Sequence, residues 1–278
     1  MPSTRNLSPI SAISPVRITA FQRRIFRFYA KHGRRLSFRE TTDSYKIAVA
    51  EIMLQQTQVD RVIPKWESWV RRWPSWKSLA NATNRQLLAE WQGLGYNRRA
   101  LFLGKAAQVI VDGFGGTTPR DPALLQTLPG IGPYTANAIL IFAFNAPLVT
   151  IDTNIRRVLL HEFGLPATLS KPELEQLAWR VLPKRRSRDW HNALMDYSVL
   201  ALPKSIAAIP PLTKQSPFEG SIRQIRGEIV RRLARQKSVT YQSVATAMNR
   251  SHDDVLRAAT SLEKDGVVKC RVESVRLK

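Results

Sequence analysis

Apolar residues recur at steps of three and four along most of the chain, whereas alternating runs bounded by turn residues are nearly absent before residue 266. Steps of three and four place apolar side chains on one face of an α-helix, while alternation would place them on one face of a strand. The pattern therefore predicts an all-α fold. The expected helices cover about residues 17–31, 44–57, 60–72, 75–80, 84–92, 97–113, 121–127, 134–144, 153–163, 171–182 and 188–200.

Residues 209–217 contain three prolines and show no periodicity, which is typical of a linker. After them the sequence predicts three helices, at 218–233, 240–248 and 251–264, and a hairpin over 267–276. Three helices followed by a ribbon is the order of a winged helix. We therefore expect a flexible tail at 1–16, a helical domain at 17–209, a linker at 210–217 and a winged-helix-like domain at 218–278.

The charge of the chain points to a polyanionic partner. The 278 residues include 43 Lys and Arg but only 21 Asp and Glu, a net charge of +22. The winged-helix-like part has 13 basic and 7 acidic residues, so we favour nucleic-acid contact for it and leave protein docking as the alternative. Residues 1–16 are rich in Ser and Pro, which is also compatible with a transit peptide, although the basic residues from Arg17 onwards fall in a helical pattern.

The cysteine and histidine content predicts no metal. Cys270 is the one cysteine, which excludes an internal disulfide or a cysteine-ligated zinc or iron–sulfur site, and the four histidines lack metal-ligand spacing. No uncharged apolar run approaches the roughly 18 residues needed to cross a bilayer. We expect a monomeric protein of the cytoplasm whose partner is a polyanion rather than a membrane.

Residues 128–136 read LPGIGPYTA and lie between two helical stretches. Gly130 and Gly132 allow a sharp turn and a close approach of another chain, and Pro133 suits the first position of a helix. The free amides at such a helix start bind phosphate. The run therefore predicts a helix–hairpin–helix that holds a nucleic-acid backbone without reading its sequence, although Gly and Pro also punctuate ordinary helical turns.

Two carboxylates stand out in the same sequence. Asp152 follows an apolar segment and begins the next helix, where it serves either as an ordinary N-cap or as an anion beside a cationic sugar. Glu51 interrupts an apolar helix, where desolvation would raise its pKa and let it act as a general acid. The alternative for Glu51 is a place on the wet side of an amphipathic helix.

These motifs, in this order, resemble the helix-hairpin-helix DNA glycosylase superfamily, and most closely its adenine glycosylases of the MutY type. The resemblance covers roughly residues 17–200 and implies a two-lobed fold. It rests on EIMLQQTQV at 51–59, WQGLGY at 91–96, LPGIGPYTA at 128–136 and NALMD at 192–196. The first corresponds to the helix that carries the acid, the second to a loop that probes the opposite strand, the third to the hairpin and the fourth to the helix before a metal cluster.

The resemblance implies a role for each matching residue. Glu51 would protonate the departing base, Asp152 would face the sugar and Tyr134 would assist near the reaction centre. Lyases of the superfamily have a lysine at the place of Tyr134, and a lysine amine forms the Schiff base that leads to strand nicking. We therefore expect a monofunctional glycosylase. The residues implied for DNA binding are Gln56, Thr57, Leu94, Tyr96, Gly130, Gly132 and Thr135, and those for the base pocket are Arg34 and Asn192.

Four departures from the family pattern bear on cofactor and substrate. Residues 199–210 contain none of the cysteines that hold a four-iron cluster in these adenine glycosylases, so we expect apolar packing to order that segment instead. The part at 218–278 does not resemble their Nudix-related domain that reads 8-oxoguanine. Phe38 replaces an expected tryptophan, and Asn192 replaces a Gln or Glu.

The expected function is removal of a mispaired base from double-stranded DNA in base excision repair, with adenine opposite guanine or 8-oxoguanine as the first hypothesis. The reaction needs a proton donor for the base and an anion for the sugar, and the nucleotide must first leave the stack. A mismatch thymine or uracil glycosylase is the alternative within enzymes. A non-catalytic DNA-binding repair protein is the alternative outside them, for which Glu51 and Asp152 would be dispensable.

Overall fold

The computed structural model describes residues 10–210 and 217–278, without the side chains of residues 207 and 208. Residues 1–9 of the expected tail and 211–216 of the expected linker lie outside the described residues. The chain divides into two compact units, which we call lobe 1 (described residues 10–44 and 136–210) and lobe 2 (described residues 45–135 and 217–278). Each lobe is therefore built from two separate stretches of sequence.

The all-α prediction is confirmed, since most described elements are helices. The α-helices are α1 (Pro15–His32), α2 (Ser44–Leu54), α3 (Val59–Arg72), α4 (Trp76–Ala80), α5 (Asn84–Glu90), α6 (Arg98–Phe114), α7 (Pro122–Gln126), α8 (Pro133–Phe144), α9 (Thr153–Phe163), α10 (Lys171–Val181), α11 (Ser187–Leu200), α12 (Ile222–Leu233), α13 (Tyr241–Met248) and α14 (His252–Lys264). Two 3-10 helices are η1 (Ser37–Arg39) and η2 (Lys204–Ala208). The strands are β1 (Ser238–Thr240), β2 (Val268–Cys270) and β3 (Ser274–Leu277).

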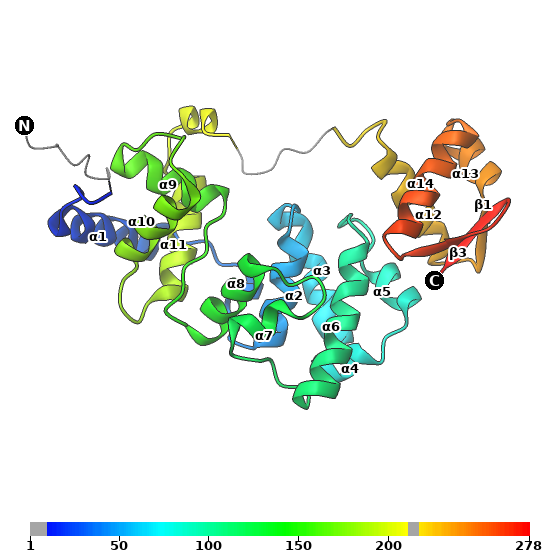
Figure 1. Cartoon of the computed structure of the whole chain (residues 1–278), viewed down its shortest axis with the longest axis horizontal. Coiled ribbons are helices and arrows are strands. Elements are labelled where there is room, and N and C mark those ends of the chain that lie inside the picture. Colours follow the sequence, from blue (N-terminus) through cyan, green and yellow to red (C-terminus); the bar gives the residue numbers. More distant parts are fainter. Residues whose placement is uncertain (1–9, 211–216) are drawn as a thin grey trace, which may run out of the picture. The chain divides into compact units, whose positions relative to one another are not determined.

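Lobe 1 packs α1, α9, α10 and α11 around one apolar core (Figure 1). Phe21 of α1 makes edge-on ring contacts with Phe163, at 5.0 Å between centroids, and with Trp190, at 5.4 Å. The core also buries Ile10 and Ile13, whose carbonyls accept hydrogen bonds from Arg180. Ile10 and Ile13 are therefore packed against this core, although residues 1–16 were predicted to form a flexible tail.

Lobe 2 is organised around α2 and a group of buried tryptophans. The α2 helix is mostly apolar, and seven of its eleven residues are buried. The indoles of Trp69 and Trp73 lie 4.7 Å apart between centroids, and Trp91 contacts Trp69 at 5.3 Å. Because these rings come from α3 and from the residues that follow α3 and α5, they fix the short helices against one another.

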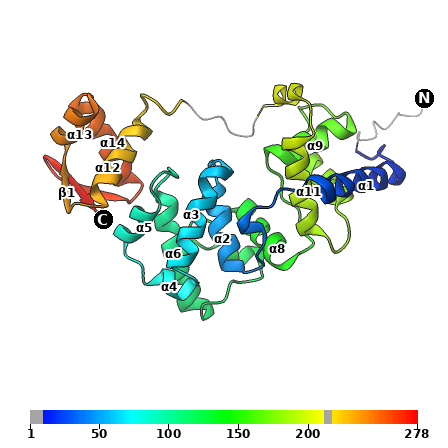
Figure 2. The same ribbon diagram turned by 180° about the vertical axis from the view of Figure 1, so that it is seen from behind.

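Residues 217–278 form three helices and a small antiparallel sheet with strand order β1–β3–β2. Figure 2 shows the three helices and β1 from behind. This confirms helices close to 240–248 and 251–264 and a hairpin near 267–276. Strand β1, which pairs Val239 with Val275, was not predicted. The first helix begins at Ile222 rather than at residue 218, and the side chain of Phe218 is 56% exposed instead of joining the buried stripe.

This C-terminal part of lobe 2 is attached to α5. Arg85 donates hydrogen bonds to the carbonyls of Leu233, at 2.7 Å, and Gln236, at 2.9 Å. Asn84 donates to the carbonyl of Lys278 at 3.1 Å. Within residues 10–210 and 217–278, no helix has both the length and the apolar character needed to cross a membrane.

Candidate active site

Glu51 lies in the last two turns of α2, between buried neighbours. Ile52 and Met53 follow it and are almost fully buried, whereas Glu51 itself is partly exposed. The apolar helix fixes its backbone, so the carboxyl group can be presented at the edge of the lobe 2 core. This arrangement is compatible with the expected general acid.

The hairpin predicted at 128–136 joins α7 to α8, as expected. Gly130 has φ +81°, and a Cβ atom added there would lie 2.9 Å from the Cβ of Phe102, so the position requires glycine. A Cβ atom added at Gly132 would have no other atom within 4 Å. Pro133 is the first residue of α8 and Tyr134 follows it with 37% of its side chain exposed, which leaves the phenol accessible at the start of the helix.

Thr135 differs from Tyr134, the residue before it, because its side chain is buried. Its hydroxyl accepts a hydrogen bond of 3.1 Å from the Nε2 of Gln55, just beyond the end of α2. This hydrogen bond therefore links the start of α8 to the residue that follows α2, and it helps to hold the hairpin in place. A side-chain contact with DNA is not the role that this burial favours.

Gln56 and Tyr96 occupy two neighbouring loops in unusual backbone conformations. Both have positive φ, +55° for Gln56 and +46° for Tyr96, although neither is glycine. Both side chains are exposed. Strained non-glycine residues of this kind cluster at functional sites, where the surroundings hold them in place. Leu94, in contrast, is buried, and its carbonyl accepts from the Thr57 hydroxyl at 3.2 Å, so Leu94 packs under the loop.

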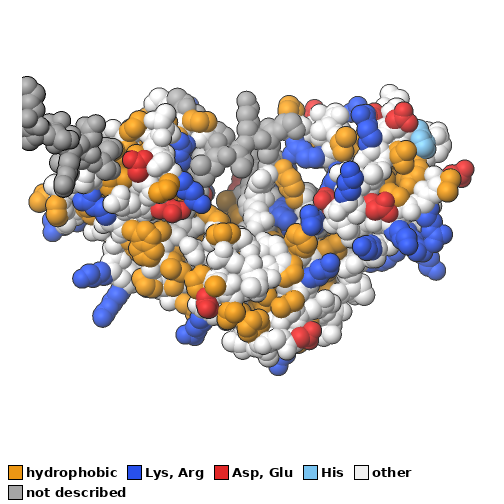
Figure 3. All heavy atoms as spheres, in the orientation of Figure 1, with side chains coloured by type: hydrophobic (Ala, Val, Ile, Leu, Met, Phe, Trp, Pro, Cys, Tyr) orange, Lys and Arg blue, Asp and Glu red, His pale blue; other side chains and the backbone are white. Residues whose placement is uncertain are grey.

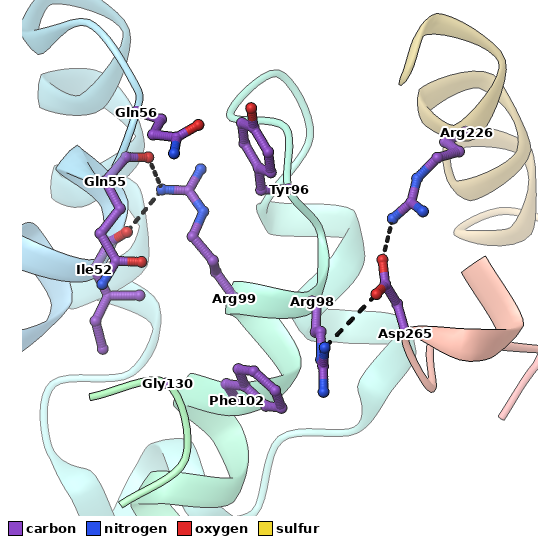
Figure 4. A pocket seen from close by; sticks show the side chains of 10 residues that line it. All are labelled: Ile52, Gln55, Gln56, Tyr96, Arg98, Arg99, Phe102, Gly130, Arg226 and Asp265. Atoms are coloured by element: carbon purple, nitrogen blue, oxygen red, sulfur yellow. Dashed lines mark hydrogen bonds and ion pairs between the residues drawn. The ribbon is translucent and has the colours of Figure 1, made fainter. Parts of the chain in front are cut away.

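A cavity of about 380 Å³ opens beside these loops (Figure 4). Asp265 forms an ion pair with Arg226 and a longer one, 3.7 Å, with Arg98, so the C-terminal part of lobe 2 supplies one wall. The Arg98 guanidinium stacks over the Phe102 ring at 4.4 Å. The lining residues are Ile52, Gln55, Gln56, Tyr96, Arg98, Arg99, Phe102, Gly130, Arg226 and Asp265.

Three of the cavity residues, Gln56, Tyr96 and Gly130, were predicted from the sequence as site residues, and the others were not. Arg99 is the most heavily bonded of the others, and its guanidinium lies between the two loops in Figure 4. Arg99 could have been singled out in the sequence because it is a charged residue among the apolar residues of α6. The helix buries it together with Ala100, Leu101 and Leu103. Arg226 and Asp265 gave no such signal.

Asp152 caps the N-terminus of α9 in lobe 1. Its carboxylate accepts hydrogen bonds from the Ile155 amide, at 2.7 Å, and from the Asn154 side chain, at 3.1 Å. Burial raises the pKa of Asp152 above its ordinary value of 3.8, and these hydrogen bonds oppose that rise. The N-capping interpretation is thus correct, and it leaves Asp152 as a desolvated carboxylate that can still meet a developing positive charge.

Two side chains from other helices hold the segment that leads to Asp152. His191 of α11 accepts from the Thr150 amide at 3.2 Å through Nε2, and its Nδ1 lies 2.7 Å from the Ser187 carbonyl, so Nδ1 carries the proton. Asn137 of α8 donates to the Val149 carbonyl at 3.0 Å. Burial lowers the pKa of His191 to about 4, so the imidazole is neutral and remains an acceptor near pH 7.

Arg34 and Asn192 also lie in lobe 1, in different surroundings. The backbone amide and the Nε of Arg34 donate to Asp196 at 2.8 and 2.7 Å, and Arg39 donates to the same carboxylate. Asp196 is fully buried, so the two arginines neutralise it and fix the end of α1 on α11. Asn192 is buried on α11 with 5% exposure. Of the predicted residues, lobe 1 thus carries Asp152, Arg34 and Asn192, and lobe 2 carries the others.

The residues that follow α11 do not fit an iron–sulfur cluster. Among the described residues, no group of three or more His, Cys, Asp or Glu could hold a metal ion, and Cys270 lies in β2 of lobe 2. The segment is instead held by Arg157, which donates to the Ile209 carbonyl at 3.1 and 2.9 Å, while Leu202 and Ile209 pack on the lobe 1 core. Arginine hydrogen bonds thus supplement the apolar packing that the sequence predicted.

The HhH-GPD superfamily of base excision DNA repair proteins matches residues 49–184. An adenine DNA glycosylase of Mycolicibacterium smegmatis is 32% identical over 288 residues, which covers 92% of this chain and 93% of that protein. The chain belongs to the HhH-GPD superfamily. Residues 49–184 include both Glu51 and Asp152, so the match covers the two carboxylates singled out in the sequence.

Other HhH-GPD relatives and neighbours agree with this assignment. An adenine DNA glycosylase of Buchnera aphidicola is 35% identical over 190 residues, or 66% of this chain and 54% of that protein, so the chain spans about half the length of this relative. The solved structure of a thermostable thymine-DNA glycosylase has a TM-score of 0.61 and 26% identity, covering 66% of this chain and 87% of that one. The predicted resemblance to helix-hairpin-helix DNA glycosylases is confirmed.

Proposed function

We propose that this DNA N-glycosylase of base excision repair removes adenine mispaired with guanine or 8-oxoguanine, works as a monomer without nicking the strand, and needs no iron–sulfur cluster. The observation that carries the substrate is the 32% identity to an adenine DNA glycosylase over almost the whole of both chains. The absence of nicking rests on Tyr134, whose phenol cannot form a Schiff base.

The two carboxylates divide the chemistry of bond cleavage. As the N-glycosidic bond breaks, negative charge develops on the base and positive charge on the sugar. Glu51, on the rigid α2 helix, is the proposed donor of a proton to the base, and Asp152 is the proposed anion beside the sugar. The Ile155 amide and the Asn154 side chain orient the Asp152 carboxylate, so it need not reorganise as the charge appears.

The remaining residues would bind and hold the opened duplex. Gly132 and the start of α8 are proposed to contact a phosphate, and Tyr134 to approach the reaction centre. Exposed Gln56 and Tyr96 are proposed to fill the gap left by the extruded nucleotide, with Thr57 and Leu94 supporting them. Asn192 is proposed to bond a purine edge in the base pocket, near Arg34.

A mismatch thymine or uracil glycosylase remains the second candidate. It is favoured by one observation, the structural similarity to a thermostable thymine-DNA glycosylase at 26% identity. The two candidates predict different released bases.

The deciding experiment measures the free base released from duplexes containing A:8-oxoguanine, A:G, T:G and U:G pairs. We expect adenine from the first two and no thymine or uracil from the others. Asp152→Asn should lower the single-turnover rate at least a hundredfold, because a preorganised charge is lost. Asp189→Asn is the matched control, since Asp189 lies on α11 of the same lobe in an exposed ion pair with Arg186 at 3.1 Å.

Other results of this experiment would change the assignment. Release of thymine or uracil in place of adenine would establish the second candidate. Full activity of Asp152→Asn would overturn the proposed mechanism. Borohydride trapping of the protein on DNA, or stoichiometric iron in the purified protein, would contradict the monofunctional and cluster-free parts of the proposal.

A further inference from the structure

The guanidinium of Arg99 is bonded to two separate segments at once. Its Nη1 donates to the carbonyls of Ile52 at 2.7 Å, Met53 at 3.0 Å and Gln55 at 2.6 Å. Its Nη2 donates to the carbonyls of Leu94 at 3.0 Å and Gly95 at 3.2 Å, and to the Thr57 hydroxyl at 3.0 Å. The first group belongs to the end of α2, and the second belongs to the loops beside it.

This arrangement needs an arginine for physical reasons. The last carbonyls of a helix have no partner within the helix and carry partial negative charge, which a cation neutralises. A planar guanidinium can address two segments simultaneously through two nitrogens, whereas a lysine ammonium is a single point of charge. Arg99 is buried, with 8% exposure, and the Trp91 and Tyr96 rings lie 5.2 and 5.6 Å from its central carbon.

The loops that Arg99 joins are the strained ones. Gln56 follows Gln55 directly, Tyr96 follows Gly95 directly, and both adopt left-handed backbone conformations that non-glycine residues avoid. Trp91 adds a further bond, from its indole nitrogen to the Gly95 carbonyl at 2.9 Å. The carbonyl before each strained residue is therefore held by Arg99, which prevents either loop from relaxing independently of the other.

We propose that Arg99 is a positioning residue that couples the loop at 93–96 to the end of α2, so that contact of Tyr96 with the opposing strand fixes the helix that carries Glu51. The proposal rests on the proposed function for its outcome in catalysis. Glu51 immediately precedes Ile52, the first carbonyl held by Arg99, so a displacement of the loop is transmitted to the acid through one side chain. Opposite-strand recognition and proton donation would thus be linked.

The experiment compares Arg99→Lys with Arg85→Lys in the full chain. Arg85 also donates two hydrogen bonds to backbone carbonyls of lobe 2, but at the attachment of the C-terminal part, so it is a matched control. Four quantities are measured for each variant: the thermal midpoint, the duplex dissociation constant, the single-turnover rate of base release, and the fluorescence of 2-aminopurine placed opposite the target, which reports unstacking of that strand.

For Arg99→Lys we expect a protein that remains folded at the assay temperature. Its single-turnover rate should fall about a hundredfold, as expected when a reacting group is displaced by about an ångström. The dissociation constant should change less than about tenfold, because phosphate contacts dominate DNA affinity. The ratio of rates on A:8-oxoguanine and A:C duplexes should fall towards one, and the 2-aminopurine signal should be lost. Arg85→Lys should match the wild type in rate, ratio and fluorescence.

The proposal is overturned if Arg99→Lys keeps the wild-type rate ratio and fluorescence signal, or if its rate falls only in proportion to its folded fraction. A purely structural arginine would give the second result. If the wild type releases no adenine at all, the proposed function fails, but the fluorescence comparison still decides whether Arg99 holds the strand-probing loops.

Discussion

His191 is the residue whose protonation most directly affects the Asp152 segment. Its Nε2 accepts the Thr150 amide only while the ring is neutral, and its folded pKa is about 4 against 6.5 for an ordinary histidine. The unfolded chain therefore binds more protons between these two values, so the stability contributed by the neutral ring is present above pH 6.5 and lost as the pH falls towards 4. The full loss amounts to about 3 kcal/mol.

The measurement is urea unfolding at several pH values for the wild type and for His191→Gln. Glutamine keeps an acceptor but does not titrate, so the difference in unfolding free energy between the two proteins should shrink or reverse as the pH falls through this window. Taking the difference also removes the contribution of Asp152, whose raised pKa acts in the opposite direction. A difference that does not change with pH would show that His191 is protonated or exposed in the native state.

At the scale of the element, the helix–hairpin–helix depends on one of its two glycines. Gly130→Ala would place a Cβ 2.9 Å from Phe102 at φ +81°, so we expect a loss of more than about 1 kcal/mol in unfolding free energy. In Gly132→Ala the added methyl group would lie in open space, so the free energy of unfolding should stay nearly unchanged. Thermal unfolding of both variants, with duplex affinity measured below the transition, tests this contrast. Equal destabilisation by the two changes would contradict it.

The sequence predicted the helices well because their signals are local. Asp152 and the Gly130 turn could be placed from neighbouring residues, whereas β1 pairs residue 239 with residue 275, and no local pattern specifies that partner. The same applies to the site. Glu51 and Tyr134 were predicted because they lie in recognisable motifs. Arg99 instead donates hydrogen bonds to backbone carbonyls more than forty residues away, such as that of Ile52. Every residue has a backbone carbonyl, so the sequence does not indicate which ones accept these bonds.

At the scale of the whole molecule, charge governs the encounter with DNA. Lys and Arg outnumber Asp and Glu by 43 to 21 in the chain, and basic side chains are prominent on the face of α12 to β3 shown in Figure 3. If six to ten phosphates are contacted, affinity for an undamaged duplex should fall about 10³- to 10⁵-fold between roughly 50 and 200 mM salt. Fluorescence anisotropy of labelled duplex at a series of salt concentrations measures the slope of log affinity against log salt concentration. An affinity indifferent to salt would contradict a phosphate-based interface.

Because each lobe is built from two stretches of sequence, some of its helices are synthesised well before the helices on which they pack. The apolar stripe of α1 packs on α9 and α11, and α11 ends at Leu200, so α1 leaves the ribosome long before its partners exist. At typical translation rates the delay is on the order of ten seconds. Residues 45–135 are contiguous and can collapse meanwhile. The apolar face of the nascent α1 helix therefore stays without its native packing partners until α9 and α11 have been translated.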